Sequence, residues 1–165
     1  MSTSPNRDKA ESILRMAQIR EAPIDIDKVA LSLGFKVVRY PFPDKLKGRV
    51  LIKDGVKVIG VNENHPSTLQ RYTIAHELGH YLNGHEHHEK TFNNDETRFY
   101  EPYFQQEKEA DMFAAELLMP KYILEKDLAE IGLEIEKLTE KYQVSEQAMW
   151  IRLTSLRLAE KYSKK

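Results

Sequence analysis

The sequence contains no cysteine, which removes disulfides and thiolate metal ligands from consideration. It also has no apolar run of membrane-spanning length, and its first ten residues, MSTSPNRDKA, contain no apolar signal segment. Neither sign of charge dominates, because 25 lysine and arginine residues face 26 aspartate and glutamate residues. The near balance provides no field that attracts nucleic acid or an anionic membrane. We therefore expect a cytoplasmic protein whose metal ligands, if any, are histidine and carboxylate.

The chain is long enough to bury a core of its own. Of its 165 residues, 41% are hydrophobic and 31% are charged, a composition typical of globular proteins. We expect a single domain over residues 1–165, with a core over about 10–120 and a helical C-terminal subdomain over about 121–160.

The first half of the chain mixes helical and extended patterns. Apolar residues recur at helical spacing over about 5–19 and 26–33. The segments FKVVRY and GRVLIKDGVKVIGVN then alternate as strands do, and Asp54-Gly55 is typical of a hairpin turn. These patterns predict a small antiparallel sheet of three strands.

The second half is predominantly helical. A helix is predicted from about Pro66 to Asn83, ended by Gly84. Residues 85–103 are polar and show no clear period, which is typical of a functional or mobile loop. QQEKEADMFAAELLMP is helical as far as its proline, and two or three amphipathic helices follow. The fold class predicted is α+β, mostly helical, with the sheet packed beside the helix of residues 66–83.

The segment IAHELGH carries the most informative spacing. His76 and His80 are four residues apart and share one helix face, so both can bind one ion. Glu77 lies about one hundred degrees round the helix, where it can accept a proton from an attacking water. Gly79 costs helix stability, and we interpret it as leaving space beside the ion. The alternative is two solvated histidines on an ordinary helix.

A catalytic zinc ion needs a third protein ligand and an open position. The segment EKEAD places Glu107 and Asp111 on one face of the next long helix. Glu107 can ligate the ion, while Asp111 accepts a hydrogen bond that orients a ligand histidine. Glu109 points elsewhere, and we interpret it as a solvated charge.

A cluster of further histidines follows the motif, at His85, His87 and His88. In one known zinc motif a third histidine follows the second by six residues, after an intervening glycine. Here Asn83 and Glu86 occupy those two positions. We therefore interpret the cluster as part of a solvated loop.

Taken together, RYTIAHELGHYL and EKEADMFAAELLMP resemble the ImmA/IrrE family of zinc metallopeptidases. VIGVN and YQVSEQAMWIRL also fit, so the resemblance covers about residues 10–158. It implies a thermolysin-like core with one Zn²⁺ per chain, held by His76, His80 and Glu107, with Glu77 as the catalytic base. Peptidases of this family cleave helix-turn-helix repressors and so induce transcription, which suggests such a protein as the substrate.

Two further roles are hypotheses. Tyr100 and Tyr103, in the loop, are candidate donors for an oxyanion. Val61 contributes to a substrate-binding edge if the second hairpin strand is the edge of the sheet. The alternative for that strand is an ordinary covered position.

The C-terminal segment LTEKYQVSEQAMWIRLTSLRLAEKY has the pattern of a helix-turn-helix. DNA binding would place Gln147, Arg152 and Arg157 near the duplex. Glu146, at the start of the second helix, opposes phosphate, and the chain has no basic surplus. A packing subdomain is the preferred interpretation.

A rival to the enzyme is a non-hydrolytic, zinc-stabilised module that binds a regulator or a toxin partner. Glu77 argues against it, because a structural site needs no base beside the metal. Structural zinc sites also use four protein ligands.

Overall fold

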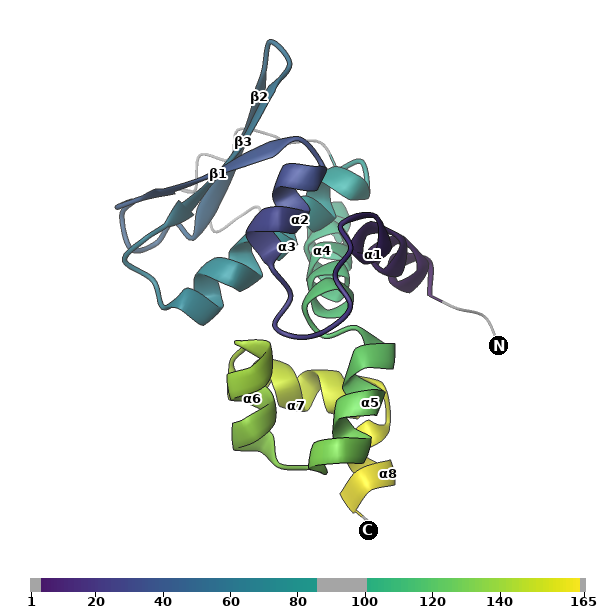
Figure 1. Cartoon of the computed structure of the whole chain (residues 1–165). Helices are drawn as coiled ribbons and strands as arrows, with labels where there is room; N and C mark the ends of the chain where they lie inside the picture. Colours follow the sequence, from purple (N-terminus) through teal and green to yellow (C-terminus); the bar gives the residue numbers. More distant parts are fainter. Residues whose placement is uncertain (1–3, 86–100, 164–165) are drawn as a thin grey trace.

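The computed structural model describes residues 4–85 and 101–163. Over these residues the chain forms helices and a small sheet (Figure 1). In chain order the elements are α1 (Pro5–Met16), α2 (Ile26–Ser32), β1 (Phe35–Tyr40), β2 (Gly48–Lys53), β3 (Val56–Asn62), α3 (Ser67–Leu82), α4 (Glu101–Leu118), α5 (Lys121–Ile131), α6 (Ile135–Tyr142), α7 (Glu146–Ser155) and α8 (Leu158–Ser163). The predicted α+β class is confirmed.

The sheet is mixed, with the strand order β1-β3-β2. β2 and β3 form the predicted antiparallel hairpin, and Asp54 and Gly55 both have positive φ, as a type I′ turn requires. The wholly antiparallel prediction was wrong, because β1 pairs parallel with β3. Asn62 holds the crossover that makes this possible: its amide donates to the carbonyls of Phe42, Pro43 and Leu46, in the loop leading to β2.

The mixed order corrects the hypothesis about Val61. Its strand, β3, is central, and Val61 pairs with Arg39 on one side and Gly48 on the other. Its side chain is fully buried. The premise that this strand is the edge of the sheet was therefore wrong, and β1 and β2 are the two edges.

Helix α3 runs beneath the sheet and packs along α4 (Figure 1). Gly79 is the point of closest approach: a Cβ atom built there would lie 3.0 Å from both Cα and the carbonyl oxygen of Ala110, and 3.2 Å from Cβ of Phe113. Gly79 therefore makes room for the backbone of α4. The interpretation that it leaves space beside an ion is replaced by a packing role.

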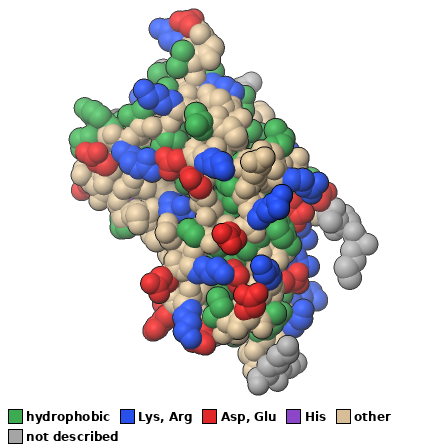
Figure 2. Space-filling model, in the orientation of Figure 1, with side chains coloured by type: hydrophobic (Ala, Val, Ile, Leu, Met, Phe, Trp, Pro, Cys, Tyr) green, Lys and Arg blue, Asp and Glu red, His purple; other side chains and the backbone are tan. Residues whose placement is uncertain are grey.

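The C-terminal helices α5–α8 lie together at the end of the molecule away from the sheet (Figure 1). Arg152 of α7 is buried there, donating to Glu116 of α4 at 2.6 Å and to the carbonyl of Met119 at 3.0 Å. A guanidinium used in this way does not reach a DNA duplex, which favours the packing interpretation. On the face drawn in Figure 2, basic and acidic side chains are intermixed over this region.

The predicted division into a core over about residues 10–120 and a C-terminal subdomain over about 121–160 stays a prediction. Among the described residues, no helix combines the length and apolar character that crossing a bilayer requires.

Candidate metal centre

Helix α3 presents His76 and His80 one turn apart with their Nε2 atoms 3.0 Å from each other. The rings stand nearly perpendicular, at 82°. Ile74 and Leu78 bury the opposite side of the helix against the core. The two imidazole nitrogens therefore meet at one point beside α4.

Glu107 of α4 completes that point. Its Oε2 lies 3.1 Å from Nε2 of His76, and its Oε1 lies 3.0 Å from Nε2 of His80. One ligand atom from each of the three side chains lies within 4.8 Å of the others. The close packing at Gly79 brings the two helices near enough for this arrangement.

The donor set fits a divalent metal such as zinc. Two imidazole nitrogens and one carboxylate form a ligand set used by catalytic zinc sites. Zinc–nitrogen distances of about 2.0–2.1 Å in a tetrahedron place ligand atoms about 3.3 Å apart, which is close to the spacings here. These three residues could therefore hold a metal with little movement.

Asp111 supports the first histidine. Its Oδ1 lies 2.8 Å from Nδ1 of His76 and also accepts a hydrogen bond from the hydroxyl of Tyr72. Burial raises the pKa of Asp111, but the hydrogen bonds from His76 and Tyr72 lower that pKa by more, so the net shift is downward. An ionised Asp111 keeps Nδ1 of His76 protonated and leaves Nε2 to face Glu107.

The same groups determine the charge of His76 in the metal-free chain. Burial lowers the pKa of His76, but its hydrogen bonds to Asp111 and Glu107 and the charges of Glu107 and Glu77 raise it more, to about 9. Half-buried Glu77 thus lies near enough to His76 for its charge to act on this site.

Two residues at the site were missed by sequence reasoning. His85, interpreted as solvated, is buried, and its Nδ1 lies 2.9 Å from Nδ1 of His80. Its Nε2 lies 2.8 Å from Oε2 of Glu109, which was interpreted as a solvated charge. The interpretation of His85 was wrong, whereas the side chain of Glu109 is 39% exposed, as expected of a solvated charge, but is paired with His85. The hydrogen bond from His85 is the largest contribution lowering the pKa of Glu109, followed by the bond from Gln105.

The end of α3 explains where His85 lies. Gly84 has φ +68°, its N–H donates to the carbonyl of Tyr81, and the N–H of His85 donates to the carbonyl of His80. This pair of hydrogen bonds is a Schellman motif, in which the second residue after the cap turns back to the last helical turn. The signal was present in the sequence, since Gly84 was predicted to end the helix.

Comparison with known proteins identifies the family. The family model of the IrrE N-terminal-like domain, peptidase family M78, matches residues 30–154. The chain belongs to the M78 peptidase family. The resemblance inferred from the two motifs is thereby confirmed. A search among curated proteins found no match.

Among solved structures, this M78 family member is similar to a Mycobacterium tuberculosis transcriptional regulator. The TM-score is 0.69 at 19% sequence identity, and the match covers 90% of this chain. It covers 46% of the regulator, so this chain corresponds to about half of that protein. At this identity the similarity shows a shared fold.

Two tyrosines of the 85–103 segment were predicted as oxyanion donors. Tyr103 lies in helix α4, not in a loop, because that helix begins at Glu101. Tyr100, His87 and His88 lie outside the described residues. The roles proposed for the two tyrosines stay predictions.

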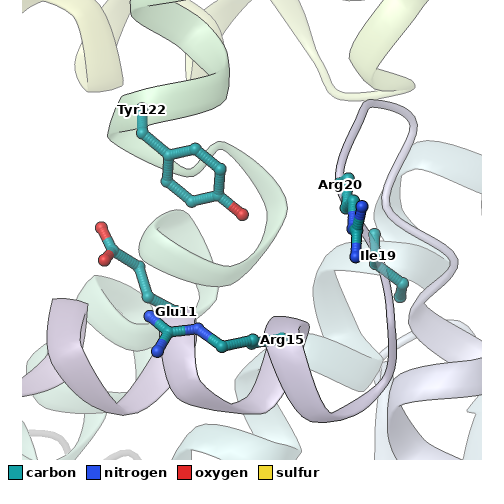
Figure 3. A pocket seen from close by; sticks show the side chains of 5 residues that line it. All are labelled: Glu11, Arg15, Ile19, Arg20 and Tyr122. Atoms are coloured by element: carbon teal, nitrogen blue, oxygen red, sulfur yellow. The ribbon is translucent and has the colours of Figure 1, made fainter.

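A pocket of about 320 Å³ lies elsewhere, between α1 and the start of α5 (Figure 3). Glu11 and Arg15 come from α1, Ile19 and Arg20 follow that helix, and Tyr122 comes from α5. None of the metal-site residues of the M78 chain lines this pocket.

Proposed function

We propose that this chain is a zinc-dependent endopeptidase that cleaves a helix-turn-helix repressor or a similar regulatory protein. The observation that carries the proposal is the meeting of His76, His80 and Glu107 at one point, with Glu77 one residue from the first ligand. Membership of a peptidase family supports the same activity.

Each side chain of the site has a distinct role in the proposed reaction. His76, His80 and Glu107 hold the ion, and Asp111 fixes the ring of His76. When bound, zinc supplies Lewis-acid chemistry, polarising a peptide carbonyl and lowering the pKa of water. The carboxylate of Glu77 accepts the proton of the attacking water and delivers it to the leaving amine. Because Glu77 is only half-buried, a substrate can approach it.

The proposed substrate class rests on the ImmA/IrrE resemblance. The similar M. tuberculosis protein is itself described as a transcriptional regulator, which agrees with a regulatory setting for the fold. We propose a protein substrate in which the scissile bond lies in an extended, accessible segment.

The first test is metal content. Wild type should bind one Zn²⁺ per chain by elemental analysis, Glu107→Ala should lose most of it, and Lys108→Ala should retain it. Lys108 is an exposed neighbour on the same helix and serves as the matched control. Because two histidines and a carboxylate also suit iron(II), the analysis should measure both metals. A wild-type chain that binds no zinc after reconstitution would refute the proposal.

The second test separates the enzyme from a zinc-stabilised binding module. Glu77→Gln should keep the metal and lose cleavage. Labelling of new N-termini in a cell lysate should then identify a regulatory protein cut by wild type and not by Glu77→Gln. If Glu77→Gln has the full biological effect of the wild type, the module is the correct alternative.

A further inference from the structure

His80, the second ligand histidine, is joined through hydrogen bonds to a further histidine and a carboxylate that can orient its ring. Asp111 orients His76, whereas Nδ1 of His80 lies 2.9 Å from Nδ1 of His85. His85 in turn has its Nε2 2.8 Å from Oε2 of Glu109. The chain His80–His85–Glu109 is thus a counterpart to the pair His76–Asp111.

Metal binding at Nε2 of His80 determines the direction of both hydrogen bonds that link His80, His85 and Glu109. If Nε2 of His80 faces the ion, its Nδ1 carries the proton and donates to Nδ1 of His85. Nδ1 of His85 is then an acceptor, so the proton of His85 is on Nε2 and is donated to Glu109. The reverse direction would place a proton on Nε2 of His80 and block the ligand atom.

We propose that His85 and Glu109 are positioning residues that fix the ring and the tautomer of His80 for metal binding. The inference rests on the proposed metal site. It requires a buried imidazole and an acceptor beyond it, and both are present: His85 is 8% exposed, while the more exposed Glu109 reaches it from α4.

The backbone holds this arrangement in place. The N–H of His85 donates to the carbonyl of His80 at 3.0 Å, so the two residues are joined by main chain as well as by side chain. Glu109 lies two residues from Glu107 on α4. A single helix therefore supplies a ligand, Glu107, and both carboxylates that support the ligand histidines, Glu109 and Asp111.

Zinc affinity tests the proposal without reference to activity. Competition with a chromogenic chelator should show zinc binding weakened about 10- to 100-fold in His85→Ala, and also weakened in Glu109→Ala. His85→Asn, which can place an acceptor near the position of Nδ1, should recover part of the loss. Lys108→Ala should bind as wild type does. Circular dichroism of each metal-free variant shows whether it is folded.

Imidazole NMR provides a readout that a purely structural role would not change. In the zinc-loaded wild type, His80 should be the Nδ1–H tautomer, with a proton protected from exchange. That protection should disappear in folded His85→Ala. Since Glu109 is at the surface, Glu109→Ala provides the same comparison if His85→Ala does not fold.

The outcomes separate this inference from the proposed function. If wild type binds one zinc and both variants match Lys108→Ala, or if His80 binds zinc through Nδ1, the positioning role is overturned while the metal site stands. If wild type binds no zinc, both are overturned.

Discussion

Gly79 of α3 lies directly against the backbone of Ala110 in α4, with no space for a side chain between them. Because Glu107 precedes Ala110 by one helical turn, this contact also sets how far the carboxylate lies from the two histidines. Packing and the metal site therefore depend on the same glycine.

Gly79→Ala should destabilise the protein. Alanine improves helix propensity by about 1 kcal/mol, but its Cβ would lie 3.0 Å from backbone atoms that cannot rotate away. We expect a net loss of about 1–3 kcal/mol in the free energy of unfolding, typical of overpacking. Urea unfolding of the metal-free protein measures it. Unchanged or increased stability would show that α4 can shift freely.

Gly84→Ala should act through the backbone alone. The residue has φ +68°, and a Cβ there meets nothing within 4 Å. The expected cost is about 1 kcal/mol, and Gly84→Asn should cost less because asparagine tolerates this conformation better. The free energy of unfolding measured in urea should therefore be highest with glycine at position 84, lower with asparagine and lowest with alanine. Equal stability of the three would mean that this turn is not maintained in solution.

Arg152→Met should be strongly destabilising. It removes the 2.6 Å partner of Glu116, a buried carboxylate whose other ion-pair partner, Arg7, is at 3.4 Å. Removing the closer partner of a buried ion pair costs about 3–5 kcal/mol. The double variant Arg152→Met, Glu116→Leu should recover part of that loss. A double variant less stable than Arg152→Met would contradict the argument.

Tyr142 should stabilise the folded protein less at alkaline pH than at neutral pH. Its hydroxyl donates to Asp127 at 2.7 Å, and burial, followed by this hydrogen bond, raises the pKa of Tyr142. The folded protein thus prefers the neutral phenol, so the contribution is complete below pH about 10 and is lost as pH rises above it. Tyr142→Phe should lose about 1 kcal/mol at pH 7.

The difference between wild type and Tyr142→Phe should therefore shrink between pH 9 and pH 11, roughly the range about the tyrosine pKa. Tyr72, whose pKa is also raised, is present in both proteins and cancels in this comparison. A difference that is constant or grows across this range would contradict the assignment.

Local signals predicted much of this structure. The hairpin turns at Asp54-Gly55, and Gly84 ends α3, both as predicted. Each of these depends on residues within a few positions of one another. The likeness of HELGH and EKEAD to a known family was likewise carried by short motifs.

Features that depend on distant pairing were not predicted. Whether β3 pairs with β1 depends on the path of the chain through residues 41–47, which no alternation of apolar residues encodes. The burial of Arg152 depends on Glu116, far away in the chain. His85 is different, because Gly84 already indicated a turn that brings it back to His80.

The three residues of the metal centre join two helices that are separated in the sequence by residues 83–100. A bound ion would therefore act as a cross-link, and opening α3 from α4 would require its release. At a free metal concentration one hundred times the dissociation constant, binding to the folded state adds about 2.7 kcal/mol to its stability. The surrounding metal concentration would then determine how often these two helices separate.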